Sequence, residues 1–205
     1  MKRVLRLITS LILFSFYLFG CTDSGPGKAA AQQKTFEPSA AASPADSGSN
    51  ASERVSFANG KVSFVPPAGF RPMTQEQIDK KFPPGNAPKH VFANERQSVS
   101  VGITFSPAKV SPDQLPEIKA AFEQMLPKMV PGLKWQNQEL VEINGTKWAR
   151  FKFISRAIDT NIQNDMYVTS FRGRALIFGF NSIVSQYDEV QASFAESRNS
   201  IKITQ

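Results

Sequence analysis

Hydrophobic and polar residues alternate with a period of two along much of the chain after residue 50. The clearest alternation spans residues 98–105, where the apolar positions are Val99, Val101, Ile103 and Phe105. Successive side chains of a strand point to opposite faces of a sheet, so this stretch predicts a half-buried strand. A shorter strand is predicted at 90–94.

Three hairpins are predicted where turn residues separate strand-like segments. Asn59-Gly60 lies between 54–57 and 61–65, and Asn144-Gly145 lies between 135–143 and 146–155. Asn-Gly favours a tight hairpin because both residues accept positive φ angles. The third hairpin joins 165–171 to 174–182 through Arg172-Gly173.

Helical patterns occupy three other stretches. Thr74 is a predicted N-cap for a helix to Phe82, with Gln77 at the capping-box position. Ser111-Pro112 begins a longer helix that Pro127 kinks or ends. A final amphipathic helix covers about 185–200. Because hairpins rather than βαβ units dominate, the sequence predicts an α+β fold in which an antiparallel sheet is covered by helices.

The first 21 residues have the organisation of a secretory signal. Basic residues at positions 2, 3 and 6 precede an apolar run from Leu7 to Phe19 that is too short to cross a bilayer, which needs roughly 20 apolar residues. The run ends in Leu18-Phe19-Gly20-Cys21, which resembles the lipobox of bacterial lipoproteins. That resemblance implies cleavage before Cys21 and lipidation of its thiol. The alternatives are an ordinary signal peptide cleaved elsewhere and an uncleaved anchor.

The chain is therefore expected to divide into a signal peptide (1–20), a lipidated cysteine with a disordered linker (21–53) and one globular domain (54–205). The linker is rich in Ala, Ser, Gly and Pro, and such composition buries too little apolar surface to fold. Cys21 is the only cysteine, so the domain is expected to fold without a disulfide.

Charge argues against a nucleic-acid partner. The formal net charge is +7, and loss of the three basic signal residues lowers it to +4. A mildly basic, exported and membrane-tethered protein is expected to contact the membrane through its lipid anchor and to bind an envelope protein. Thr22 follows the cysteine, where an Asp favours inner-membrane retention in enterobacterial-type lipoproteins; this favours the periplasmic side of the outer membrane in a cell that has one.

The predicted domain resembles the PsbP-like superfamily and, within it, the bacterial DcrB-type envelope lipoproteins. The resemblance covers roughly residues 54–203 and lies in hydrophobic patterns and turns, namely 64–70 (FVPPAGF), 143–150 (INGTKWAR), 177–181 (IFGFN), the mid-chain helix and the terminal helix. It implies a sheet with helices on both faces, and it implies accessory, assembly or binding work without catalysis.

A candidate binding surface is predicted on one face of the strand at 146–155. Trp148, Arg150 and Lys152 share this face, opposite Phe151 and Phe153. A tryptophan beside two cations suits an anionic or sugar-like ligand, and Arg172 and Arg174 would enlarge the surface if they project to the same end. The alternative is that helices cover the face and the cationic side chains pack on Trp148.

No catalytic, cofactor or metal site is predicted. His90 is the only histidine, and no nucleophile stands in a recognisable motif. Residues 159–165 faintly resemble a calcium loop but lack its Gly and its bidentate Glu. Two other functions remain as alternatives. One is an envelope-polymer hydrolase using Asp159, Asp165 or His90; the other is a carrier or chaperone for an apolar ligand, which requires Phe151 and Phe153 to be accessible.

Overall fold

The computed structural model describes residues 52–82 and 87–204. The predicted signal peptide, the lipobox, Cys21 and the linker as far as residue 51 lie outside the described residues. Within the described part of the chain, no helix combines the length and the apolar character needed to cross a membrane.

The main structure is a seven-stranded antiparallel sheet in the order β3-β4-β5-β9-β8-β7-β6. Its strands are β3 (Arg71–Pro72), β4 (His90–Ala93), β5 (Val99–Lys109), β6 (Lys134–Ile143), β7 (Thr146–Arg156), β8 (Asn161–Phe171) and β9 (Arg174–Ile183). Successive hairpins join β6 to β9. Asn144 and Gly145 adopt φ angles of 49° and 76° at the β6–β7 turn, which confirms the predicted Asn-Gly hairpin.

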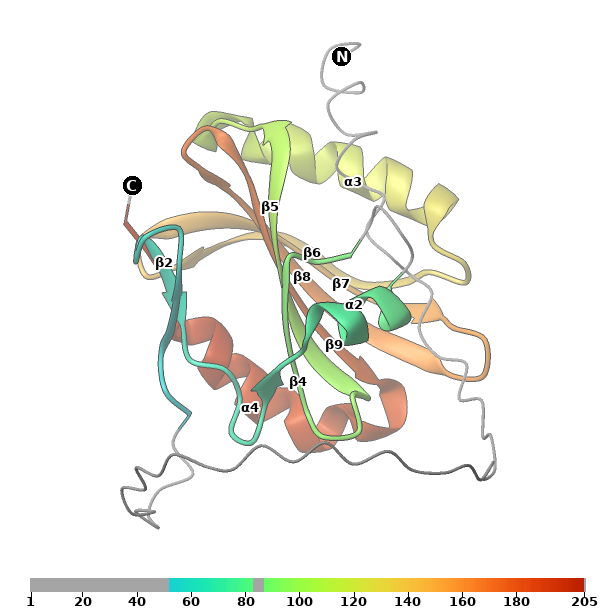
Figure 1. The fold of residues 1–205 in the computed structure, drawn as a ribbon. Helices are drawn as coiled ribbons and strands as arrows, with labels where there is room; N and C mark the ends of the chain where they lie inside the picture. Colours follow the sequence, from blue (N-terminus) through green and yellow to red (C-terminus); the bar gives the residue numbers. More distant parts are fainter. Residues whose placement is uncertain (1–51, 83–86, 205) are drawn as a thin grey trace, which may run out of the picture.

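Helices cover both faces of this sheet, as Figure 1 shows. They are α2 (Gln75–Lys81), α3 (Leu115–Met129) and α4 (Tyr187–Asn199), with short 3₁₀ turns at η1 (Pro112–Gln114) and η2 (Val184–Gln186). One face buries Phe151 and Phe153 beneath α3, where Phe122 stacks on Phe151 with ring centroids 5.0 Å apart. The opposite face buries Trp148, Phe178 and Phe180 towards α4. The expected α+β architecture is therefore confirmed.

A small second sheet completes the α4 side of the core. Strand β2 (Val62–Phe64) pairs with β1 (Val55–Phe57) and with β10 (Lys202–Ile203), both antiparallel. Val62 and Phe64 are fully buried, and Phe64 contacts Phe178 of the main sheet edge-on at 5.5 Å. The sequence did not predict β10, since two residues carry no periodic pattern.

Three sequence expectations need correction. Strand β5 is buried on both faces rather than one, because Ser100 and Gly102 also lie under other segments; a Cβ built on Gly102 would lie 3.0 Å from Pro88 Cγ. Strand β8 begins at Asn161 and not at Asp165, so the loop expected over 159–165 is mostly strand. Helix α3 continues through Pro127 to Met129.

The predicted cap of α2 is confirmed. The Thr74 hydroxyl accepts from the amide of Gln77 at 3.3 Å, and the Gln77 side chain accepts from the amide of Thr74 at 2.8 Å. This reciprocal pair satisfies two amide groups that the first turn of a helix leaves without intrahelical partners.

Candidate functional site

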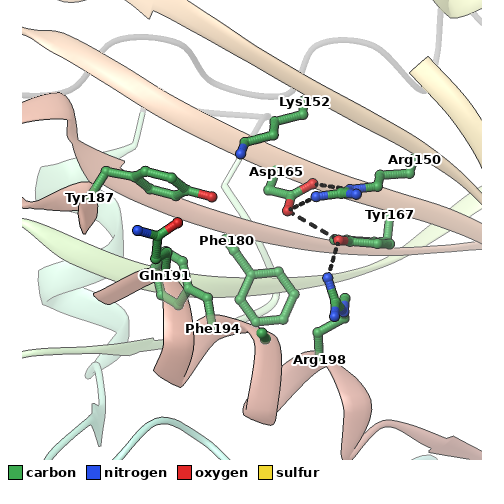
Figure 2. Close-up of a pocket in the computed structure, with 10 residues that line it drawn as sticks. Arg150, Lys152, Asp165, Tyr167, Phe180, Tyr187, Gln191, Phe194 and Arg198 are labelled. Carbon is green, nitrogen blue, oxygen red and sulfur yellow. Dashed lines mark hydrogen bonds and ion pairs between the residues drawn. The ribbon is translucent and has the colours of Figure 1, made fainter. Parts of the chain in front are cut away.

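A pocket of about 210 Å³ lies between α4 and the face of the main sheet formed by β7, β8 and β9 (Figure 2). Its apolar lining is Phe180 of β9 with Phe194 and Ala195 of α4, and the two phenyl rings are 5.3 Å apart. The polar lining comes from the sheet and from the helix: Arg150, Lys152, Asp165, Tyr167, Tyr187, Gln191 and Arg198. We call this cavity the sheet–α4 pocket.

Strand register brings the sheet residues together. Arg150 lies opposite Tyr167, and Lys152 lies opposite Asp165, on paired strands β7 and β8. Alternation along each strand then directs all four side chains to the α4 face. The same rule places Trp148 on this face, one pair further along β7.

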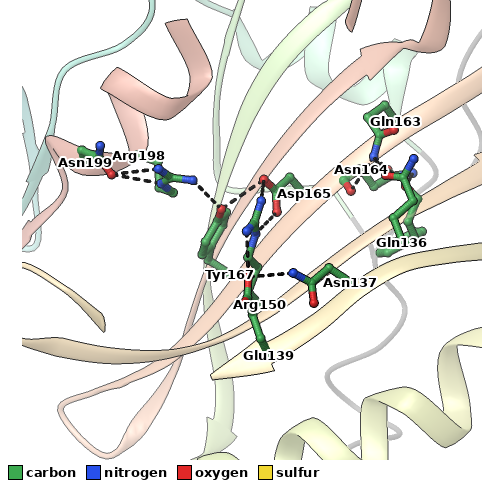
Figure 3. Close-up of polar contacts among 11 residues, drawn as sticks. Gln136, Asn137, Glu139, Arg150, Gln163, Asn164, Asp165, Tyr167, Arg198 and Asn199 are labelled. Carbon is green, nitrogen blue, oxygen red and sulfur yellow. Dashed lines mark hydrogen bonds and ion pairs between the residues drawn. The ribbon is translucent and has the colours of Figure 1, made fainter. Parts of the chain in front are cut away.

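Arg150 and Asp165 form a bidentate ion pair, which Figures 2 and 3 show. Arg150 donates through Nε to Asp165 Oδ1 at 2.8 Å and through Nη2 to Oδ2 at 2.9 Å. Its Nη1 donates to Glu139 of β6 at 2.7 Å. The hydrogen bond from Arg150 to Asp165 raises the pKa of Arg150, so the guanidinium stays charged.

Tyr167 connects this ion pair to α4. Its hydroxyl donates to Asp165 Oδ2 at 3.0 Å and accepts from Nη1 of Arg198 at 3.2 Å (Figure 3). Burial, followed by the charge of Asp165, raises the pKa of Tyr167. The phenol therefore stays protonated in the neutral range and serves as a hydrogen-bonding link rather than a base.

Lys152 lies at the other side of the pocket. Its ammonium group is 4.8 Å from the centroid of the Tyr187 ring, a cation–π distance. The ion pairs among the described residues include no carboxylate partner for Lys152 or for Arg198. Three cations and one carboxylate therefore line the pocket.

The one carboxylate that lines the sheet–α4 pocket is held by its neighbours. Asp165 already accepts three hydrogen bonds from Arg150 and Tyr167. No serine, cysteine, threonine or histidine is among the residues that line the pocket.

The structure brings together only part of the predicted binding surface. Arg150 and Lys152 line the sheet–α4 pocket, but Trp148 is 0% exposed and belongs to the core. Its ring lies edge-on to Phe178 and Tyr167 at 6.0 and 6.5 Å, and no acceptor for its indole N–H lies within the described parts of the chain. Trp148 is covered because the terminal helix and the small sheet pack over this face, which corrects the expectation that its ring is offered to a ligand.

Arg172 and Arg174 lie away from the pocket, at the exposed β8–β9 turn. Phe171, which precedes Arg172 and lies opposite Arg174, is six residues beyond Asp165 and four beyond Tyr167 along β8. At about 3.3 Å per residue, these separations are about 20 and 13 Å. The two arginines therefore do not enlarge the site.

The residues named for a hydrolase are dispersed. His90 is on β4, separated from β8 in the sheet by β5 and β9, and its ring packs on Phe57 at 4.6 Å. Asp159 is exposed in the β7–β8 turn, whereas Asp165 is buried on β8. Among the described residues, no three His, Cys, Asp or Glu side chains gather in a group suited to a metal ion.

The carrier alternative required accessible Phe151 and Phe153. Both rings are 0% exposed beneath α3. The packed core on this side leaves no apolar groove at these two rings.

Sequence reasoning missed Tyr167, Tyr187, Gln191 and Arg198 as site residues. One signal was present: Gln163, Asp165 and Tyr167 alternate with Asn164, Met166 and Val168, a pattern that extends β8 to Asn161 and places Asp165 beside Tyr167. Packing of α4 on this face, which brings Arg198 to Tyr167, has no comparable local signal.

A second, wider depression of about 480 Å³ lies beside edge strand β3. Its lining, from strands β3 and β4, α2 and the adjoining loops, includes one cation, Arg71, and one carboxylate, Glu95. Its charges balance and its lining does not converge on a ligand group, so it is the weaker candidate.

No family model matches the chain, and no curated protein matches it. Similar solved structures exist. The solution structure of cyanobacterial PsbP (CyanoP) from Synechocystis sp. PCC 6803 has a TM-score of 0.56 and 15% identity, covering 80% of this chain and 98% of that one. LpqN of Mycobacterium tuberculosis, described as involved in cell envelope biogenesis, has a TM-score of 0.49 and 10% identity, covering 75% and 90% of the two chains.

The similarity to CyanoP shows the fold of the described domain, which is PsbP-like α+β. At 15% identity it shows the fold alone.

Proposed function

We propose that this protein is a cell-envelope lipoprotein, anchored through lipidated Cys21, whose PsbP-like domain of the DcrB type acts as a non-enzymatic binding or accessory module. The lipobox Leu18-Phe19-Gly20 before the single cysteine supports the anchor. The 32 residues from Thr22 to Glu53, as a random coil, would span about 30 Å. The domain would then act close to the membrane, on the periplasmic side of the outer membrane in a cell that has one.

The observation that carries the non-enzymatic part is the state of Asp165. It is the one carboxylate among the residues lining the sheet–α4 pocket, and Arg150 and Tyr167 hold it in a closed set of hydrogen bonds. Both of its oxygens already accept hydrogen bonds inside the protein, so this carboxylate is not presented to a ligand in the pocket. The pocket offers hydrogen-bond donors and positive charge, which suit recognition of a partner or ligand.

Lipidation is tested by labelling cells with radioactive palmitate. The intact protein should incorporate label, and the Cys21→Ser variant should incorporate none, because the chain has no other cysteine. The matched control is Ser24→Ala, which alters the same segment and leaves the thiol. Absence of label in the intact protein, or a mature N-terminus mapped away from Cys21, would contradict the anchor.

The accessory role is tested by crosslinking the lipidated protein in its own envelope, followed by capture under denaturing conditions. Recovery of one envelope protein in constant ratio supports an accessory module. Turnover of purified envelope polymer by the protein, lost in Asp165→Asn, would instead support the hydrolase alternative.

A further inference from the structure

Two cations that face the sheet–α4 pocket are not neutralised within it. Arg150 shares its charge with Asp165 and Glu139, but Lys152 and Arg198 have no carboxylate within 4.0 Å among the described ion pairs. The acidic residues of α4, namely Asp188, Glu189 and Glu196, are exposed and do not line the pocket. The pocket therefore has an excess of positive charge in a partly enclosed space, where charge is screened less than at an open surface.

Hydrogen-bond donors in the pocket also exceed acceptors. An ammonium group has three N–H donors, and the described contact of Lys152 is with the face of the Tyr187 ring. The Tyr187 hydroxyl has no hydrogen bond among the described contacts, and the Gln191 amide donates only weakly to Asp188 O at 3.4 Å. Figure 2 shows the Lys152 ammonium and the Tyr187 hydroxyl directed towards the same space, with Gln191 beneath the tyrosine.

We propose that the sheet–α4 pocket binds a small anion, whose phosphate or carboxylate group is held by Lys152, Tyr187 and Gln191 in a pocket that Arg198 also lines. Ionised acceptors form shorter and stronger hydrogen bonds than neutral ones, so an anion matches this donor set better than a neutral polyol. Phe180 and Phe194 provide an apolar wall for the remainder of a small organic molecule. The bound anion can come from either of two sources. One is a soluble phosphate or carboxylate compound, and the other is the headgroup of an anionic lipid.

This inference deepens the proposed binding role and names the ligand class. Its test uses the full chain in nanodiscs of neutral phosphatidylcholine, with inorganic phosphate and acetate as the probes. A ligand that binds the folded state raises the thermal unfolding midpoint in a concentration-dependent way. We expect at least one probe to raise the unfolding midpoint more than sodium chloride does at equal ionic strength.

Matched variants test the position of the anion. Lys152→Gln should weaken probe binding at least about tenfold, the loss expected for one charge-assisted contact. Lys147→Gln makes the same charge change on β7 at an exposed position outside the pocket and should bind as the unaltered protein does. Tyr187→Phe keeps the ring and removes the hydroxyl, and should weaken binding by a smaller factor; it remains informative if Lys152→Gln fails to fold.

The lipid source is tested by adding phosphatidylglycerol to the nanodiscs. A Lys152-dependent rise in the midpoint, with loss of the added effect of phosphate, identifies a headgroup in the pocket. An unchanged response to the probes identifies a soluble anion. The proposal is overturned if neither probe acts beyond sodium chloride, or if Lys147→Gln weakens binding as much as Lys152→Gln. Palmitate labelling is independent of these results, so failure of the anion site leaves the proposed anchor standing.

Discussion

Arg198 donates a hydrogen bond from Nη1 to the hydroxyl of Tyr167 over 3.2 Å, and this contact joins α4 to the middle of the main sheet. Tyr167 passes the interaction on to Asp165 at 3.0 Å, which in turn is held by Arg150 (Figure 3). Four residues that are up to 48 positions apart thus form one connected polar network. It lies on the face of the main sheet that α4 covers. Such a network is stabilising only when each member is satisfied.

Removing the Tyr167 hydroxyl tests how much this link contributes. Tyr167→Phe keeps the buried ring but leaves Arg198 and Asp165 each without one partner, so we expect the free energy of unfolding to fall by about 1–3 kcal/mol. Urea unfolding measures the change. Tyr187→Phe is the control, because that hydroxyl has no described hydrogen bond, and it should change stability by less than about 0.5 kcal/mol. Equal losses in the two variants would show that the Tyr167 link is not structural.

Breaking the Arg150–Asp165 pair should cost more than breaking an exposed pair. The side chains of Arg150 and Asp165 are 19% and 11% exposed, and Arg150→Met strands a largely buried carboxylate. We expect the free energy of unfolding to fall by about 3 kcal/mol. This is the lower end of the range for breaking a buried ion pair, because Arg150 is partly exposed to solvent. Arg150→Met combined with Asp165→Leu should recover part of it, since the buried carboxylate is then gone and the Glu139 carboxylate, which also loses Arg150, is 38% exposed to water.

The control for that experiment is Lys80→Met. Lys80 and Glu76 form an ion pair one helical turn apart on α2, with side chains 76% and 77% exposed. Surface pairs of this kind contribute little, because water and salt screen the two charges. A loss in Lys80→Met that matches the loss in Arg150→Met would contradict the role assigned to burial.

The sequence predicted local structure well where the signal was local. Asn144-Gly145 lies at the turn between strands that alternate, so the β6–β7 hairpin and the opposed faces of Trp148 and Phe151 followed from the pattern. Thr74 and Gln77 specified the start of α2 in the same way.

What the sequence could not predict is which segment covers each face. Alternation predicts which residues share a face of a strand, but not which segment covers that face. Helix α4 begins some 40 residues after Trp148, packs on its face of the sheet and helps to bury the indole. The partner of Arg150 lies 15 positions away, where the expected loop over 159–165 meets the strand expected from 165. Asp and Asn are depleted in strands, so the segment before Asp165 gave no strand signal. These polar residues are tolerated in β8 because they bond one another and their neighbours: Asn164 donates to Ser155 Oγ at 2.9 Å, and Gln163 donates to Gln136 Oε1 at 2.6 Å (Figure 3).

Lys81 should make the protein more stable at alkaline pH. Burial lowers its pKa from 10.5 to about 8. Below pH 8 the folded and unfolded states both carry the protonated amine, and the fold bears the cost of burying it. Between pH 8 and 10.5 the unfolded chain binds more protons, so this residue raises the free energy of unfolding with pH, by about 3 kcal/mol in total.

Comparison with Lys81→Met isolates this contribution. The variant also loses the hydrogen bond from the ammonium to Gln97 O, so the informative quantity is the change with pH. The unaltered protein should gain stability relative to the variant between pH 8 and 10.5. Urea unfolding at a series of pH values measures it, with Lys80→Met as the exposed control. A stability difference that stays constant across this range would show that the ammonium group is not desolvated in the folded state.

His90 should change stability with pH in the same direction, but in the acid range. Burial first, and then the charge of Lys89, lowers its pKa below the ordinary value of 6.5. As the pH falls below 6.5 the unfolded chain takes up a proton that the folded state resists, so the free energy of unfolding decreases. His90→Phe keeps a ring against Phe57, 4.6 Å away in the unaltered protein, and should reduce this acid sensitivity. Because His90 is the only histidine, its proton NMR signal reports the pKa directly; a value at or above 6.5 would contradict the packing inferred for this ring.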